Sequence, residues 1–221
     1  MRTRLLTIAA AVGVAATMLP SHAATAPAAP KAQVTDPAGD ANGINDQGAG
    51  LANVNVSGPA DDANADITSV LFATKYKTVT TTKTVVKVVK KKRVVTKVTV
   101  VTQVPDGFTV TMNLSAAPDG NHTYDVNATH PTCSGTVDFT YSGGPFGLNE
   151  VDCLDAADPT KITTLPGEAA VVGNAVVWTI PAGAFAVGSA FGALTAETGA
   201  PLAAVLMDQA GDGTATYKVG S

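Results

Sequence analysis

Apolar and polar residues alternate one by one along most of this chain, and Gly, Pro, Asn or Asp interrupts the alternation about every ten residues. A period of two sends successive side chains to opposite faces of a strand. Short alternating segments between frequent turn residues are typical of antiparallel all-β domains. The charged fraction is only 14%, and Ala and Val supply most of the apolar residues, which argues against a disordered acidic chain and a helical coiled coil. We therefore predict an antiparallel β-sandwich, of the immunoglobulin-like or jelly-roll kind.

Ten segments rich in Val, Ile, Thr, Tyr or Phe carry this alternation and are predicted to be strands. They are residues 66–76, 108–114, 123–128, 136–141, 148–154, 169–172, 175–180, 193–198, 203–207 and 214–219. Turns are predicted at residues 105–107, 118–120, 173–174 and 199–201, because their residue types fix φ or tolerate a positive φ.

The start of the chain has the pattern of a secretory signal peptide. Arg2 and Arg4 precede an apolar stretch, and a small-x-small cleavage pattern ends at Ala23. Cleavage there leaves 12 of the 14 basic residues against 18 acidic ones, a net charge of −6. No later run has the roughly 18 apolar residues of a membrane span, so we predict a secreted, soluble protein without a transmembrane segment. The predicted organisation is a signal peptide over residues 1–23, a flexible lead-in over residues 24–31 and one β-sandwich domain over residues 32–221.

Cys133 and Cys153 are the only cysteines of the chain, and an exported protein enters an oxidising compartment. Two alternating segments between them flank a turn at Gly143, which is ten residues from each cysteine. A hairpin turning there would place the cysteines side by side, and a disulfide is predicted. The alternative is a metal site that combines the two cysteines with His122 and His130, although this spacing matches no standard zinc pattern.

Residues 75–97 consist almost entirely of Thr, Val and Lys, and they carry nine of the twelve basic residues left after cleavage and no acid. Thr and Val favour a strand, but neither alternating face is apolar, which indicates a projecting basic β-ribbon. No Gly or Asn marks a tight turn at its predicted tip. The cations either prevent edge-to-edge aggregation or contact an anionic surface such as a wall polymer, an acidic glycan or phospholipid headgroups. The residues assigned to this contact are Lys87, Lys90, Lys91, Lys92 and Arg93.

Residues 36–46 place five oxygen-bearing side chains and two glycines in eleven residues. Calcium takes about six to eight oxygen ligands, and glycine lets a loop curl closely enough to supply several of them. Residues 208–212 repeat the D-x-A-G-D pattern of residues 36–40, and the two loops are predicted to converge. The alternative is that these residues only form turns. The predicted calcium ligands are Asp36, Asp40, Asn42, Asp46 and Asp66.

Asp36-Pro-Ala-Gly-Asp40 lies near the start of the predicted domain, and a polar loop then leads to Asp66 at the beginning of a strand. This order resembles the N-terminal part of secreted sandwich modules related to the DOMON and family 9 carbohydrate-binding domains. Residues 176–181, Val-Val-Trp-Thr-Ile-Pro, are similar to a late strand of that group. The order of these motifs also resembles exported actinobacterial proteins of unassigned function. The resemblance implies a sandwich fold, calcium near Asp36, Asp40 and Asp66, and glycan binding.

Aromatic residues limit the ligands that are expected. Trp178 is the only tryptophan, and its place within an apolar strand predicts a core residue rather than a sugar-binding platform. No aromatic residue lies between Tyr76 and Phe108 to stack on bases, so nucleic acid is not an expected partner. The Met and His residues give no basis for haem.

No catalytic pattern stands out. The chain contains no G-x-S-x-G, H-E-x-x-H or G-x-x-x-x-G-K motif, so neither a nucleophile elbow, a zinc protease helix nor a nucleotide-binding loop is expected. A small hydrolase would need a carboxylate pair drawn from Glu150, Asp152, Asp155 and Asp158. We predict a secreted, non-catalytic extracellular binding module, calcium-stabilised and glycan-binding. The alternative is a cell-surface or wall-interaction protein that acts through the basic ribbon.

Overall fold

The computed structural model describes residues 29–39, 41, 62–143, 147–155, 157–158, 160–200 and 205–220. The predicted signal peptide lies outside these residues. The chain divides into two compact units, and the described part of the first unit is the segment Thr80–Thr102. The second unit comprises Pro27–Val79 and Gln103–Ser221 and contains the remaining described residues.

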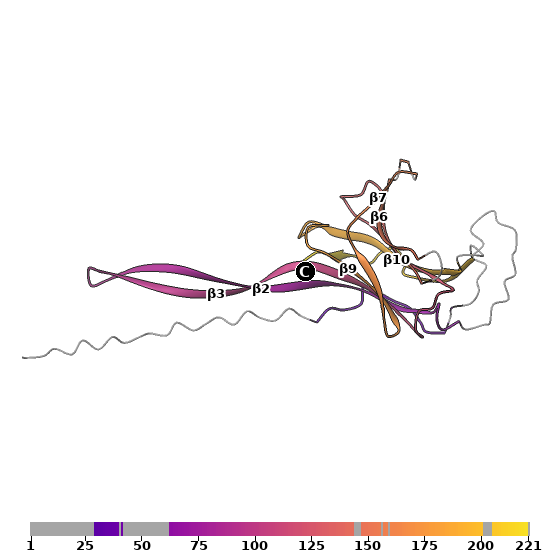
Figure 1. Ribbon diagram of the computed structural model, residues 1–221, viewed down its shortest axis with the longest axis horizontal. Helices are drawn as coiled ribbons and strands as arrows, with labels where there is room; N and C mark the ends of the chain where they lie inside the picture. Colours follow the sequence, from indigo (N-terminus) through magenta and orange to yellow (C-terminus); the bar gives the residue numbers. More distant parts are fainter. Residues whose placement is uncertain are drawn as a thin grey trace, which may run out of the picture. The chain divides into compact units, whose positions relative to one another are not determined.

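The second unit is built from two antiparallel β-sheets, and its described residues contain no helix (Figure 1). The first sheet has the order β1–β2–β3–β9–β8, and the second has the order β11–β10–β4–β5–β6–β7, with β12 paired to β10. The strands of the first sheet are β1 (Val34–Thr35), β2 (Ile67–Val89), β3 (Lys92–Leu114), β8 (Glu168–Val172) and β9 (Ala175–Ile180). Those of the second are β4 (Thr123–Thr129), β5 (Thr136–Ser142), β6 (Asn149–Leu154), β7 (Ile162–Thr164), β10 (Ala190–Ala200), β11 (Val205–Ala210) and β12 (Tyr217–Lys218). One buried core joins side chains of both sheets, which confirms the predicted all-β sandwich.

Aromatic side chains from both sheets fill this core. Phe72 of β2 meets the ring of Phe139 edge-on at 5.8 Å and the ring of Phe191 at 5.6 Å, and both partners belong to the second sheet. Trp178 of β9 is fully buried, and its Nε1 donates a hydrogen bond to the carbonyl oxygen of Thr140 on β5 at 3.2 Å. Trp178 is therefore a core residue, as predicted.

Most of the predicted strands are present, with ends that differ by a few residues. The predicted turns at residues 118–120 and 173–174 do separate strands. Two short strands, β1 and β7, were not predicted, because two or three residues are too few to display an alternation. Residues 66–76 and the outgoing half of the ribbon form one continuous 23-residue strand, β2.

The expected turn at residues 105–107 is wrong, because these residues lie inside β3. Gly107 has a φ of +94°, and a Cβ at this position would lie 2.2 Å from the carbonyl oxygen of Ile180. Gly107 has this positive φ where the backbones of β3 and β9 approach closely, and β3 continues on both sides of it.

Candidate functional site

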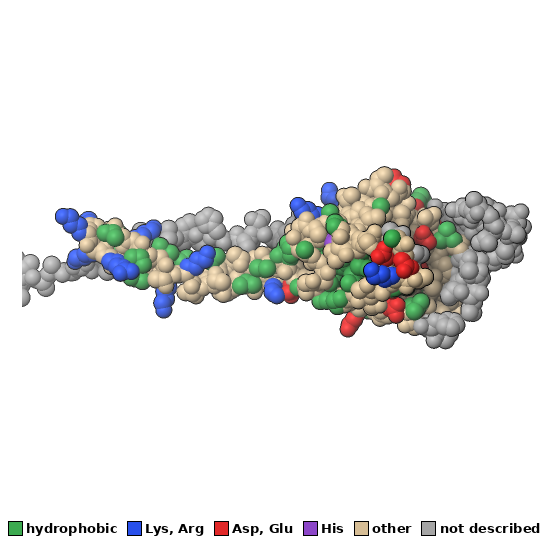
Figure 2. Space-filling model, turned by 90° about the horizontal axis from the view of Figure 1, so that it is seen from above, with side chains coloured by type: hydrophobic (Ala, Val, Ile, Leu, Met, Phe, Trp, Pro, Cys, Tyr) green, Lys and Arg blue, Asp and Glu red, His purple; other side chains and the backbone are tan. Residues whose placement is uncertain are grey.

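The segment Thr80–Thr102 is a two-stranded ribbon formed by the end of β2 and the start of β3. All seven of its basic side chains are exposed, and apolar side chains lie between them (Figure 2). No ion pair joins any of the seven to a carboxylate among the described residues. This set includes the five residues that were assigned to an anionic contact. The seven residues are Lys83, Lys87, Lys90, Lys91, Lys92, Arg93 and Lys97.

Two lysines form the turn of the ribbon. Lys90 has a φ of +48° and Lys91 a φ of +63°, the left-handed values of a two-residue type I′ hairpin turn. Asn and Gly are the residues usually found at such positions, because a positive φ is costly for other side chains. The structure therefore places a tight turn at the predicted tip without the residues that normally signal one.

Two buried carboxylates organise the start of β2. Asp66 is 1% exposed, and its Oδ2 accepts hydrogen bonds from the backbone N–H of Gly39, at 2.8 Å, and from the hydroxyl of Ser115. Asp208 of β11 is also buried, and its Oδ2 accepts a hydrogen bond from the N–H of Ile67 at 2.7 Å. The described part of each D-x-A-G-D segment therefore contacts the start of β2, the first through Gly39 and the second through Asp208.

The predicted calcium ligands are only partly described. The Oδ1 atom of Asp66 is buried and has no hydrogen-bond partner within the described part of the chain. Asp36 is half-buried just after β1. Asp40, Asn42 and Asp46 lie outside the described residues. Among the residues that are described, no group of three or more His, Cys, Asp and Glu side chains is arranged to hold a metal ion.

Cys133 and Cys153 form a disulfide, as predicted, with their Cα atoms 5.3 Å apart. The hairpin of β5 and β6 lies between them, and Cys153 is opposite Val137 in its register. Cys133 precedes β5, so the disulfide fastens the segment before the hairpin to its second strand. Because the two cysteines bond to each other, the alternative metal site that included them is wrong.

The two described histidines are buried and are held by neighbouring side chains. His122 is 6% exposed, with its Nδ1 2.7 Å from Asp119 Oδ1 and its Nε2 3.2 Å from Asp62 Oδ2. His130 is 3% exposed and packs against the ring of Phe191, with centroids 4.6 Å apart. Burial lowers the pKa of His130, which favours its neutral form. Within the described part of the chain, no hydrogen bond joins either histidine ring to a Ser, Thr or Cys side chain.

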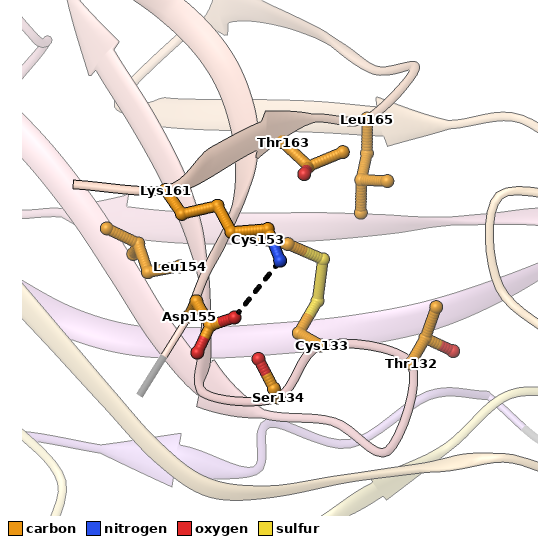
Figure 3. Close-up of a pocket in the computed structure, with 9 residues that line it drawn as sticks. All are labelled: Thr132, Cys133, Ser134, Cys153, Leu154, Asp155, Lys161, Thr163 and Leu165. Carbon is orange, nitrogen blue, oxygen red and sulfur yellow. Dashed lines mark hydrogen bonds and ion pairs between the residues drawn. A yellow bond between two sulfur atoms is a disulfide. The ribbon is translucent and has the colours of Figure 1, made fainter. Parts of the chain in front are cut away.

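A pocket of about 260 Å³ opens beside the disulfide (Figure 3). Its polar lining includes Ser134, Asp155 and Lys161, and Lys161 Nζ lies 3.5 Å from Asp155 Oδ2. Hydrogen bonds from the N–H of Ala157 and from Ser134, together with Lys161, lower the pKa of Asp155. The side chain of Lys161 is 69% exposed. These polar side chains allow the pocket to contact a small polar molecule.

The outward face of the second sheet carries a row of carboxylates that the sequence did not predict. Glu197 of β10 lies opposite Asp125 of β4, and Asp138 of β5 lies opposite Asp152 of β6. Asp138 also pairs with Asn127, two residues along β4 from Asp125, so the four acids are neighbours. In each strand the acid occupies a polar position of the alternating pattern. The sequence does not show how the four strands align with one another, and this alignment brings the acids together.

Two of these carboxylates, Asp125 and Asp138, have a raised pKa. Burial, and then the charges of Asp125, Glu197 and Asp152, raise the pKa of Asp138 to about 6. Burial and the charge of Glu197 raise the pKa of Asp125 to about 6, although a hydrogen bond with Thr140 acts in the opposite direction. Asp125 and Asp138 therefore take up protons in mildly acidic solution.

Of the four acids considered for a hydrolase, only Asp155 lines either of the two pockets found among the described residues. Glu150 and Asp152 lie two residues apart on β6, and neither lines the pockets beside the disulfide. Asp155 pairs with Lys161, and Asp158 accepts a hydrogen bond from the hydroxyl of Thr160 at 2.6 Å. This arrangement gives no support to a carboxylate pair for glycoside hydrolysis.

Comparison with protein-family models, with curated proteins and with solved structures found no match to this chain. The resemblance to DOMON and family 9 carbohydrate-binding modules therefore stays a prediction that rests on short motifs. The described part of the chain contains no helix with the length and apolarity of a membrane span.

Proposed function

We propose that the protein is an extracellular, non-catalytic binding module whose contact surface is the basic ribbon Thr80–Thr102 and whose ligand is an anionic surface, such as a wall polymer, an acidic glycan or phospholipid headgroups. The observation that carries this proposal is the exposure of seven cations without a carboxylate partner among the described residues. Like charges on one ribbon repel one another, and a ligand of opposite charge relieves this repulsion. The signal-peptide pattern and the disulfide support an extracellular site of action.

The turn of the ribbon favours a binding role over protection from aggregation alone. Lysines spaced along the strands are enough to prevent edge-to-edge pairing. They do not require lysine at the two turn positions, where a positive φ costs on the order of 1 kcal/mol for a residue other than Gly or Asn. Lys90 and Lys91 occupy these positions nevertheless, which concentrates charge at the tip.

Retention of the mature protein on immobilised heparin and polyphosphate tests this function. We expect Lys90→Asn with Lys91→Gly to elute at lower salt than the wild type, because two charges are lost from the ribbon. This double variant installs the preferred turn residues, so weaker retention cannot be explained by a damaged hairpin. A further variant with Lys87, Lys92 and Arg93 also changed to Gln is expected to pass through the column.

The matched control removes two charges outside the ribbon, with Lys31→Gln and Lys161→Gln, and is expected to elute with the wild type. Elution of all variants at the same salt concentration would overturn the proposed function. Aggregation of the neutralised variants with unchanged retention would instead support a purely protective role for the lysines.

Calcium binding at the start of β2 is a second candidate function. Asp66 is almost completely buried, yet one of its carboxylate oxygens has no hydrogen-bond partner in the described residues. A buried acceptor without a partner is costly, and a hard cation is a suitable partner for a carboxylate oxygen. Asp36 precedes Gly39, which contacts Asp66, by three residues in the same loop and carries a further carboxylate.

Thermal unfolding with EDTA, with Ca²⁺ and with Mg²⁺ tests this candidate. An ion that binds only the folded protein raises its melting temperature. We expect a rise with Ca²⁺ that is absent in Asp66→Asn and retained in the control Asp212→Asn. Equal melting of the wild type in all three conditions would overturn calcium binding and leave the ribbon proposal unaffected.

A further inference from the structure

The register of the ribbon follows from its turn. β2 ends at Val89 and β3 begins at Lys92, so the two-residue turn places these residues opposite each other. Counting outward along both strands places Thr78 opposite Gln103. The side chains of these two residues are hydrogen bonded at 3.1 Å, which confirms the count.

Three exposed valines share one face near the tip. The same count places Val86 opposite Val95 and Val88 opposite Arg93, and residues two apart on a strand point to the same face. The exposed fractions are 44% for Val86, 73% for Val88 and 58% for Val95. Arg93 and Lys97 lie on this face beside them, so cationic and apolar side chains are interleaved.

A purely ionic ligand does not account for the valines. Threonine has the same branched shape and a similar preference for strands, and β2 uses it at residues 80–82 and 84. Closer to the tip, β2 has valine in place of threonine at residues 86 and 88, and the apolar side chains of these valines are exposed to water. A polymer of phosphate or sulfate groups would neutralise the lysines without covering that surface.

We infer that the ribbon binds the surface of an anionic phospholipid bilayer, with its basic side chains at the lipid phosphates and Val86, Val88 and Val95 at the boundary between headgroups and acyl chains. This inference rests on the function proposed above, because it names the anionic partner of the same ribbon. Lys and Arg can lay their aliphatic stems along apolar surface while their charges stay at the phosphates. Clusters of about four to eight basic residues beside apolar side chains are typical of segments that bind anionic leaflets.

Co-sedimentation of the mature protein with vesicles tests the inference. We expect binding to vesicles of phosphatidylglycerol and phosphatidylcholine, and none to vesicles of phosphatidylcholine alone. The triple variant Val86→Thr, Val88→Thr, Val95→Thr keeps every charge and the strand preference, and it is expected to bind the anionic vesicles about tenfold more weakly while its retention on heparin is unchanged. The control changes three valines outside the ribbon that are similarly exposed and is expected to bind as the wild type. These are Val171, Val172 and Val187, each changed to Thr.

Insertion is measured separately with Val88→Trp and vesicles that carry brominated acyl chains. Trp178 is fully buried and provides a constant background, so additional quenching reports the new tryptophan. Quenching supports the inference, and its absence overturns it.

Equal vesicle binding by the valine triple variant and the wild type would also overturn the inference, because charge alone would then explain binding. Retention on heparin without binding to vesicles would overturn the lipid partner and leave the proposed function standing, whereas loss of both would overturn both.

Discussion

Asp138 and Asp152 lie directly opposite each other on β5 and β6, and the Oδ1 atom of each is buried without a hydrogen-bond partner among the described residues. Two carboxylates in this relation repel each other, and no donor within the described residues compensates these two buried oxygens. Asp125 and Glu197 extend the row across β4 and β10. The outward face of this sheet is therefore less stable when its acids are ionised.

The stability of the folded protein is expected to depend on pH because of this row. The pKa of Asp138 and that of Asp125 are raised from 3.8 to about 6, so the folded state binds protons more readily than the unfolded state between these values. Their contribution is therefore fully present below about pH 4 and is lost as the pH rises through 6. We expect the free energy of unfolding to increase by about 1 to 3 kcal/mol for each carboxyl between pH 8 and pH 4.5, measured by urea unfolding.

Asp138→Asn isolates the effect of one carboxylate. The amide cannot ionise, so this variant should be more stable than the wild type at pH 8 and equally stable near pH 4.5. The control Asp158→Asn removes an acid whose pKa is lowered by hydrogen bonds with Thr160, and it should not gain stability at pH 8. A loss of stability in Asp138→Asn at pH 8 would contradict the idea that its charge is unfavourable.

The alternation of the sequence predicted the sandwich and the hairpin that brings Cys133 near Cys153, because both depend on local pattern and short-range pairing. The carboxylate row could not be predicted, since it depends on how β10, β4 and β5 align, and strand register is not local information. The segment 105–107 was misjudged for a related reason. Pro and Gly are typical of turns, but here they lie within β3, where Gly107 allows the close approach of Ile180.

The disulfide should make a measurable contribution to stability. It closes a loop with a sequence separation of 20, and cross-links of this size typically stabilise a fold by about 2 to 4 kcal/mol. We expect the double variant Cys133→Ala, Cys153→Ala to lose this amount in urea unfolding. Dithiothreitol should destabilise the wild type to the same extent and leave the variant unchanged. Unfolding of wild type and variant at the same urea concentration would show that the hairpin holds this region without the bond.

Gly107 should tolerate substitution less well than a glycine with a similar φ in open space. In Gly107→Ala the new methyl group would meet the carbonyl oxygen of Ile180 at 2.2 Å, so the backbone of β3 or β9 must shift. We expect a loss of about 2 kcal/mol or more in the free energy of unfolding. Gly183 is the matched control, because its φ of +92° is almost the same and nothing lies within 4 Å of the place that a Cβ would occupy. Gly183→Ala should lower the free energy of unfolding by only about 1 kcal/mol. Equal losses in the two variants would mean that the positive φ alone, and not the contact with Ile180, causes the destabilisation.

The ribbon should be removable without unfolding the sandwich. In its register Thr81 lies opposite Val100, and the hydroxyl of Thr81 is 3.5 Å from the carbonyl oxygen of Val100, so Asn-Gly in place of residues 82–99 would close the hairpin there. The side chains lost are mostly exposed, and a shorter connection costs little entropy, so the melting temperature should stay within about 3 °C of the wild type. The shortened protein should no longer be retained on heparin.

The control for the new turn is the full-length variant Lys90→Asn, Lys91→Gly, which has the same turn residues and keeps the rest of the ribbon. A fall of more than about 10 °C would mean that the ribbon contributes to the stability of the fold as well as to binding.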